Sequence, residues 1–301
     1  MKPNFFIVGA PKSGTTALYE YLRVHPEIFM PPAVKEPHFF DREFQMLRMM
    51  QYDSLEAYLA LFAAASQEKC VGEGSVYYLY SERAASNIWN FNPDAKIIAI
   101  LRNPIDMMYS HFYQQRYAGN EVLRTFERAL AAEGDRKRGI GVSPRLVEKK
   151  LFYREIGCYS VQLERYFACF GREQVQVIIF DDFVKNTELV YRETLEFLNV
   201  DPGFQAEFVV HNANKIPRFH SINRFRFYPP GWFKPVRVGL RRLLSNSVRA
   251  RIGTVIHNLN TEVAGRPPMN PVTRRQLQEE FRSEIERLSN LLQRDLLHWC
   301  E

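Results

Sequence analysis

The sequence predicts an α/β fold with three layers, in which a central parallel sheet is flanked by helices. Apolar runs recur at Phe5–Val8, Lys96–Leu101 and Val175–Phe180. These runs lack the apolar–polar alternation that marks a half-exposed strand, so we expect strands buried on both faces. Because a helix-like stretch follows each run, we expect the strands to lie parallel and the connecting helices to cover both faces of the sheet.

The helices expected after these strands span Thr15–Val24, Pro104–Arg116 and Val184–Leu198. A weaker strand is expected at Lys69–Val71. Strands and helices therefore alternate through most of the first 200 residues, as the predicted fold requires.

Two helical regions are expected later in the chain. Between Val147 and Phe170 the apolar spacing indicates helical segments interrupted near Gly157, and Gly171 is expected to cap the last of them. A final helix is expected over Thr273–Leu297, after a proline-rich break.

The composition is that of an ordinary globular protein, with 301 residues of which 46% are hydrophobic and 25% charged. We expect a single domain over 1–301 and no bilayer-spanning segment, since that needs about 20 apolar residues in a row. The first expected strand begins at Phe5, which leaves no room for a secretion signal, so a cytoplasmic location is expected. Four cysteines without Cys-x-x-Cys spacing agree with free thiols in a reducing compartment.

The positive charge is concentrated in one region. The chain carries a net charge of +6, and no acidic residue lies between Glu207 and Glu262. We interpret residues 215–266 as an irregular basic insertion or lid. An alternative is a basic surface that binds nucleic acid or an anionic membrane, because aromatic residues are interleaved with the charges.

The segment Gly9–Thr16 reads Gly-Ala-Pro-Lys-Ser-Gly-Thr-Thr and joins the first expected strand to the first expected helix. Glycines at such a junction let backbone N–H groups approach a phosphate-like anion, so the sequence predicts a P-loop-like fold. ATPases place a lysine directly after the second glycine, but here Thr15 follows Gly14 and the lysine is Lys12. A P-loop kinase or NTPase therefore remains an alternative that this spacing disfavours.

The loop resembles that of sulfotransferases that use 3′-phosphoadenosine 5′-phosphosulfate (PAPS). The run continues through Ala17-Leu18 to His25-Pro26, and is similar to heparan sulfate sulfotransferase domains and small bacterial sulfotransferases. The resemblance implies PAPS as sulfuryl donor, with PAP as product and no metal. It also implies that the donor is held by loop residues, of which the lysine stabilises the leaving group: Lys12, Ser13, Gly14, Thr15 and Thr16.

A second anion site is expected at Arg102 and Ser110. Arg102 follows a strand, and ligands of parallel sheets bind at the carboxyl ends of strands. Ser110 lies about two helical turns further on, within reach of the same phosphate. This pair resembles the family's site for the 3′-phosphate. Lys215 and Arg218 stand about where a late basic loop of the family begins, although an ordinary solvated loop fits them nearly as well.

The stretch from Lys35 to Asp41 contains the candidate bases. Heparan-type enzymes have a similar segment with a catalytic glutamate, which implies Glu36 as base, with His38 as its neighbour or substitute. Chemistry alone allows either residue. The family's next loop carries Glu-Lys, whereas this chain has Glu73-Gly74. The expected acceptor is a hydroxyl of a carbohydrate or a small metabolite.

Overall fold

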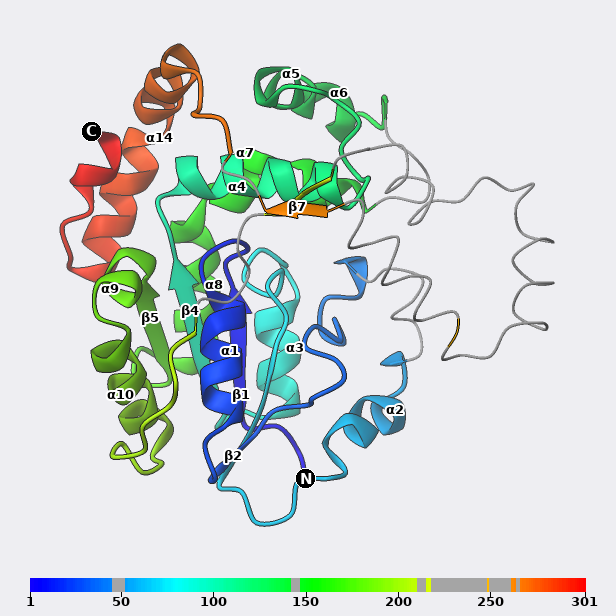
Figure 1. Ribbon diagram of the computed structural model, residues 1–301, viewed down its shortest axis with the longest axis vertical. Coiled ribbons are helices and arrows are strands. Elements are labelled where there is room, and N and C mark those ends of the chain that lie inside the picture. Colours follow the sequence, from blue (N-terminus) through cyan, green and yellow to red (C-terminus); the bar gives the residue numbers. More distant parts are fainter. Residues whose placement is uncertain (45–51, 142–146, 210–214, 218–247, 249–260, 264–265) are drawn as a thin grey trace.

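The computed structural model describes residues 1–44, 52–141, 147–209, 215–217, 248, 261–263 and 266–301. Its centre is a five-stranded sheet with the order β2-β3-β1-β4-β5, in which all neighbouring strands are parallel (Figure 1). The strands are β1 (Phe5–Gly9), β2 (Ile28–Phe29), β3 (Cys70–Gly74), β4 (Lys96–Leu101) and β5 (Val175–Ile179). The predicted fold class is therefore confirmed.

Successive residues of the central strand pack on opposite faces of the sheet. Phe5 and Ile7 belong to one buried apolar cluster, and Phe6 and Val8 belong to another. All four side chains are fully buried. This is why β1 appears in the sequence as a continuous apolar run, since neither face of the strand meets water.

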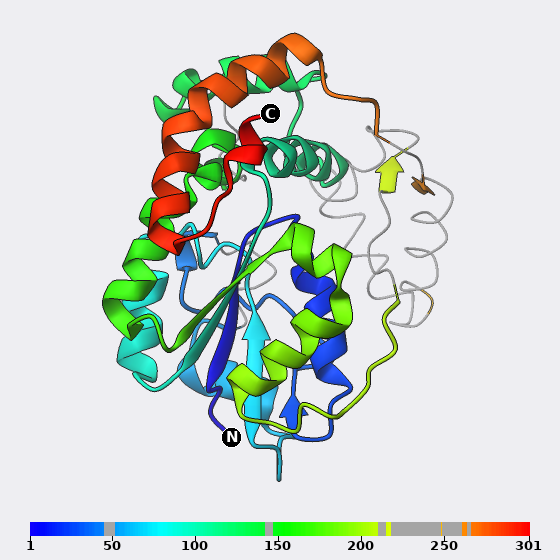
Figure 2. The same cartoon turned by 90° about the vertical axis from the view of Figure 1, so that its left-hand side faces the viewer.

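Helices cover both faces of the sheet (Figure 2). The smaller cluster contains buried residues of α1 (Thr15–Arg23), α9 (Phe180–Lys185) and α10 (Thr187–Leu198). The larger cluster contains buried residues of α3 (Ala84–Phe91), α4 (Pro104–Tyr117), α8 (Tyr159–Phe170) and α14 (Pro271–Leu292). The C-terminal helix α14 packs against α8 and so belongs to the same three-layer unit.

Shorter helices complete the described chain. They are α2 (Leu55–Leu59), α5 (Phe126–Ala131), α6 (Glu133–Lys137) and α7 (Tyr153–Gly157), with 3-10 turns at Arg42–Phe44, Ala60–Phe62, Glu148–Leu151 and Leu297–Cys300. None of the described helices is long and apolar enough to cross a bilayer.

Several element boundaries differ from those expected. Phe180 begins α9 and does not end β5, and the helix expected over Val184–Leu198 is divided at Asn186, whose side chain accepts a hydrogen bond from the Leu189 amide and caps α10. The last helix ends at Leu292 because Gln293 takes a left-handed conformation, with φ 53°. Gly171 does cap α8, with φ 72°.

The carboxyl edge of the sheet joins the two halves of the expected site. The Ala10 amide donates to the Ile100 carbonyl at 2.7 Å, which ties the loop after β1 to β4. Strand order reverses between β1 and β4, the place where ligands bind in open parallel sheets. Strand β6 (Lys215–Pro217) pairs antiparallel with β7 (Thr261–Val263) and lies against α4. Most of the expected basic insertion lies outside the described residues.

Candidate active site

The loop between β1 and α1 is tightly folded around Gly14. Gly14 adopts φ 87° at the N-cap of α1, and a Cβ atom there would lie 3.2 Å from the rings of Phe180 and Phe183. Ser13 is fully buried, and its hydroxyl donates to the Pro11 carbonyl at 3.3 Å. The first amides of α1 have no partner within the helix, so they and the helix dipole favour an anion in front of the loop.

Lys12 lies in this loop with φ 61°, a conformation that a non-glycine side chain rarely adopts. Burial lowers the pKa of Lys12, and the charges of Arg266, Arg102 and Lys35 lower it further, to about 8. Positive charges thus converge around the loop, which is the electrostatic setting that an anionic ligand would relieve.

Arg102 follows β4, as expected, and reaches the loop. Its Nη1 donates to the Lys12 carbonyl at 3.4 Å, and its guanidinium lies 5.0 Å from the centre of the Phe180 ring. Ser110 lies on the next helix, α4, where its hydroxyl is buried without a hydrogen-bond partner among the described residues. A buried hydroxyl of this kind suits a ligand oxygen, and so this pair fits a second phosphate.

Arg266 joins these cations from a distant part of the chain. It is half-buried, and its guanidinium lies 6.0 Å from the centre of the Tyr113 ring. Burial and the charge of Arg102 lower the pKa of Arg266. The hydroxyl of Tyr109 on α4 donates to the Pro267 carbonyl at 3.0 Å, which fixes this segment over α4.

The structure does not describe the side chains of Lys215 and Arg218, the two late basic residues that we expected near the donor. Lys215 begins β6, and only its backbone is described. Arg218 lies outside the described residues. The late cation that the structure describes beside the loop is Arg266, which the sequence analysis missed.

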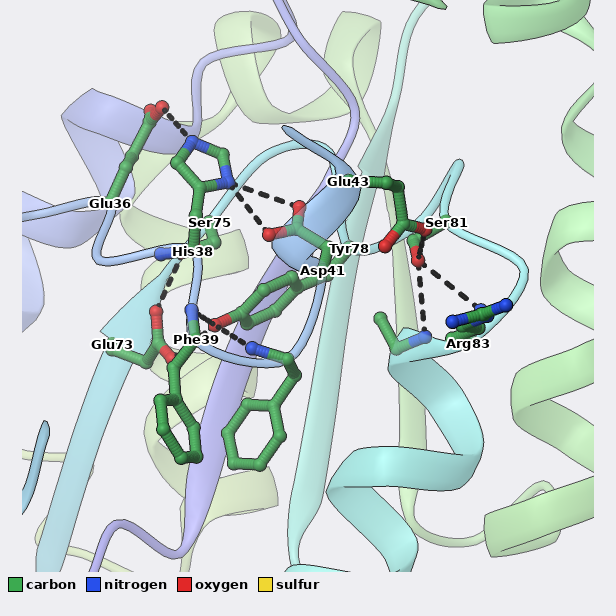
Figure 3. Close-up of polar contacts among 12 residues, drawn as sticks. Glu36, His38, Phe39, Asp41, Glu43, Glu73, Ser75, Tyr78, Ser81 and Arg83 are labelled. Atoms are coloured by element: carbon green, nitrogen blue, oxygen red, sulfur yellow. Dashed lines mark hydrogen bonds and ion pairs between the residues drawn. The ribbon is translucent and has the colours of Figure 1, made fainter. Parts of the chain in front are cut away.

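Glu36, His38 and Asp41 form a connected group of side chains (Figure 3). The Nδ1 atom of His38 lies 3.0 Å from both carboxylate oxygens of Asp41, and its Nε2 atom lies 3.6 Å from Glu36 Oε2. Asp41 is fully buried, whereas the Glu36 side chain is 31% exposed. Of the two carboxylates, Glu36 is therefore the one within reach of an incoming acceptor.

The charges of this group support one another. Burial lowers the pKa of His38, but the charge and hydrogen bonds of Asp41 together with Glu36 outweigh it and raise the pKa to about 9. Burial raises the pKa of Glu36, but Lys35, His38 and Lys150 outweigh it and lower the pKa to about 2. At neutral pH the free protein thus holds an imidazolium between two carboxylate groups.

A buried carboxyl group supports the backbone of this segment (Figure 3). Glu73 accepts hydrogen bonds from the hydroxyls of Tyr58, Ser75 and Tyr78 at 2.8–2.9 Å. Ser75 in turn accepts from the His38 amide at 3.2 Å, and Tyr78 accepts from the next two amides. These bonds hold His38 at φ 56°. Glu73 and Ser75 are fully buried, so they position the segment and are not exposed to an acceptor.

Gly74 stands where the family's lysine was expected, and Lys35 lies beside it. A Cβ atom built at Gly74 would be 3.6 Å from Lys35 Cε, and the Gly74 amide donates to the Lys35 carbonyl at 3.3 Å. Lys150 is buried nearby, with its ammonium 4.7 Å from the centre of the Tyr77 ring. Neither lysine was assigned a role from sequence: Lys35 directly precedes the segment of the candidate bases, and Lys150 stands in no recognisable motif.

A parallel α/β sheet with a loop after β1 whose amides and cations suit an anion defines a P-loop-like fold. Residues 2–215 match the family described as "Sulfotransferase domain". The chain therefore belongs to the sulfotransferase family. In the described part of the chain, no group of three His, Cys, Asp or Glu side chains could hold a metal ion.

Several known proteins are similar to this chain. A sulfotransferase of known structure from Alicyclobacillus acidocaldarius is 30% identical, with a TM-score of 0.74 and complete coverage of both chains. Carbohydrate sulfotransferase 15 of Mus musculus is 28% identical over 66% of this chain and 44% of its own length. Bifunctional heparan sulfate N-deacetylase/N-sulfotransferase 4 of Mus musculus is 30% identical over 67% of this chain and 23% of its own length. The match thus spans less than half of these curated relatives.

Proposed function

We propose that this protein is a PAPS-dependent sulfotransferase that transfers a sulfuryl group to an acceptor hydroxyl. The observation that carries the proposal is the convergence of Lys12, Arg102 and Arg266 at the loop, with Glu36 facing the same loop. PAPS bears phosphate groups at two ends, and the chain offers anion-binding groups at two places. The buried hydroxyl of Ser110 fits the second of these places.

The donor side relies on positioning and charge. The loop amides with the hydroxyls of Thr15 and Thr16 suit the 5′-phosphate, and Arg102, Ser110 and Arg266 suit the 3′-phosphate. Lys12 would stabilise the negative charge that develops on the bridging oxygen as the sulfur–oxygen bond breaks. A flexible point charge is suited to this task, because it can follow the oxygen as bonding changes.

The acceptor side relies on Glu36 as base. Both ring nitrogens of His38 face carboxylate oxygens, and its raised pKa keeps the imidazole protonated near neutral pH. A protonated imidazole cannot accept a proton, so we assign proton removal to Glu36 and a positioning role to His38. The acceptor oxygen then bonds to sulfur from the side opposite the leaving oxygen, and its proton passes to Glu36.

A carbohydrate is the first acceptor class that we propose. The names of the similar proteins refer to carbohydrate and to heparan sulfate, and the half-buried Glu36 side chain keeps 31% of its surface exposed. A small metabolite with a hydroxyl group is the second class.

The proposal is tested by incubating the purified protein with PAPS and a panel of saccharides and small alcohols, with mass spectrometry to detect the added sulfuryl group. Parallel reactions with ATP and magnesium test phosphoryl transfer. Sulfuryl transfer that persists in the presence of a chelator supports the proposal. Phosphoryl transfer from ATP, with none from PAPS, contradicts it.

A further inference from the structure

Lys35 links the donor loop to the candidate base. Its Nζ donates to the hydroxyls of Thr15 and Thr16 at 3.2 and 3.1 Å, and to Glu36 Oε1 at 3.4 Å. Its side chain is 18% exposed, so these bonds are sheltered from bulk water. The ammonium therefore contacts two threonines that we assign to the donor's 5′-phosphate and also the carboxylate that we assign to the acceptor's proton.

The contacts of Lys35 with the threonines have a consequence for hydroxyl orientation. A hydroxyl that accepts from an ammonium keeps its own proton for another partner. The protons of Thr15 and Thr16 are then available for an anion at the start of α1. Lys35 thus orients the hydroxyls of Thr15 and Thr16 as hydrogen-bond donors to an anion, and it also supplies a positive charge.

The position of Lys35 is well supported by its neighbours. Tyr19 on α1 donates to the Pro31 carbonyl at 2.7 Å, and the Lys35 ammonium lies 6.0 Å from the centre of the Tyr19 ring. The Gly74 amide donates to the Lys35 carbonyl at 3.3 Å, and Lys35 Cε lies within ordinary contact distance of a Cβ atom built at Gly74, at 3.6 Å. These contacts favour one orientation of the Lys35 side chain, toward Thr15 and Thr16.

We propose that Lys35 is the second cation of the sulfuryl-transfer site, contacting the oxygens of the sulfuryl group while it passes from the donor toward the acceptor beside Glu36. Lys12 then stabilises the oxygen that leaves, and Lys35 stabilises the group that moves. This inference rests on the proposed function, because it assumes a sulfuryl donor in the loop.

Glu36 provides an independent readout of the Lys35 charge. The charged groups that act on Glu36 are Lys35, His38 and Lys150, and Glu36 in turn acts on Lys12. The Lys35 ammonium lies 3.4 Å from Glu36 Oε1, closer than His38 Nε2 lies to Glu36 Oε2, at 3.6 Å. Loss of the Lys35 charge should raise the pKa of Glu36 and move the acid limb of the pH profile upward.

The test compares Lys35→Gln, which keeps a hydrogen-bond donor, with Lys35→Arg, which keeps the charge. Lys69→Met is the matched control, because Lys69 is exposed and precedes β3 at the opposite edge of the sheet. Turnover with PAPS, PAP affinity by calorimetry, thermal midpoints and pH profiles are measured for each. We expect Lys35→Gln to lower kcat by about 10²-fold, as for loss of one charge-stabilising donor.

PAP lacks the sulfuryl group, so its affinity should fall much less than kcat in Lys35→Gln. The acid limb should move upward in Lys35→Gln only, and Lys35→Arg should keep most of the turnover. Unchanged turnover and acid limb in Lys35→Gln, or equal losses in both variants with equal loss of thermal stability, would overturn the inference alone. A wild-type protein that neither binds PAP nor uses PAPS would overturn the proposed function as well.

Discussion

Asp41 holds His38 through both of its carboxylate oxygens, each 3.0 Å from Nδ1 of the imidazole. The carboxylate is fully buried, so this contact is shielded from water. The contact fixes the orientation of the ring, and Nε2 consequently faces Glu36. Asp41 thus orients His38, and His38 in turn contacts Glu36, the proposed base.

Replacement of Asp41 by Asn should therefore act through His38. The Asp41 charge raises the pKa of His38, so Asp41→Asn should lower that pKa toward its ordinary value of 6.5. We expect kcat to fall by about 10²-fold, at the lower end of the range found for acid–base groups. PAP affinity, measured by calorimetry, should change little. A fall in PAP affinity that matches the fall in kcat would contradict a role confined to the acceptor side.

Replacement of Glu36 by Gln should have a larger effect, because it removes the proposed proton acceptor itself. The expected loss in kcat is about 10²- to 10⁴-fold. His38→Ala, measured over the same pH range, should leave more activity than Glu36→Gln. The reverse order would assign proton removal to His38.

The charge of Lys12 should limit activity at high pH. Because burial and neighbouring cations lower the pKa of Lys12 to about 8, the free enzyme loses this charge as the pH rises through that value. The profile of kcat/KM reports groups of the free enzyme, so its alkaline limb should lie near pH 8. Lys12→Met should lower kcat by about 10²- to 10³-fold. Near-normal turnover in this variant would exclude the role that we assign to Lys12.

Arg266 should contribute to nucleotide affinity, although no local motif singles it out within the basic region 215–266. A hydrogen bond to a charged group contributes about 1.5–3 kcal/mol, so Arg266→Ala should weaken PAP binding by about 10- to 150-fold. Because Arg266 also lowers the pKa of Lys12, the alkaline limb should move upward in this variant. Arg294→Ala is a suitable control, since Arg294 pairs with Asp182 at the surface. Equal PAP affinity in both variants would exclude Arg266 from the donor site.

Glu73 should make stability depend on pH. Burial raises the pKa of Glu73 from 4.5 to about 7, although its three hydroxyl partners oppose the shift. The native chain keeps this proton over a range in which the unfolded chain has lost it, so stability should fall as the pH rises from 4.5 to 7. The full difference is about 3 kcal/mol. Thermal midpoints of Glu73→Gln should show a weaker decline over this range, and a decline equal to that of the wild type would contradict the shift.

The sequence predicts the sheet better than the site because apolar runs report burial directly. The strand expected at Lys96–Leu101 matches β4 at both ends, since both faces of that strand are covered. Strand β2 was missed because two residues carry no usable periodicity. Asn186 looks like an ordinary helix residue until its cap contact with Leu189 is seen.

In the site, the sequence predicts the residues that stand in motifs. It does not predict the residues that the fold brings into contact with them. Lys12, Arg102 and Glu36 stand in local patterns that predict chemistry. Asp41 stands in the same stretch as His38, three residues away, but its contact with the ring becomes known only from the structure. Arg266 acts through contacts that depend on how distant segments meet, which no local pattern reports. The left-handed backbone at His38 likewise depends on two hydroxyls from the turn that follows β3.

The bond between Tyr109 and Pro267 also bears on the order in which the molecule becomes functional. Synthesis proceeds from the N-terminus, and a domain generally folds as a unit. The loop with Lys12 is made early, but Arg266 follows all five strands of the sheet. A nascent chain that already holds its parallel sheet would therefore bind nucleotide weakly. Tight binding of the nucleotide would then indicate that the segment with Arg266 and Pro267 has packed against α4.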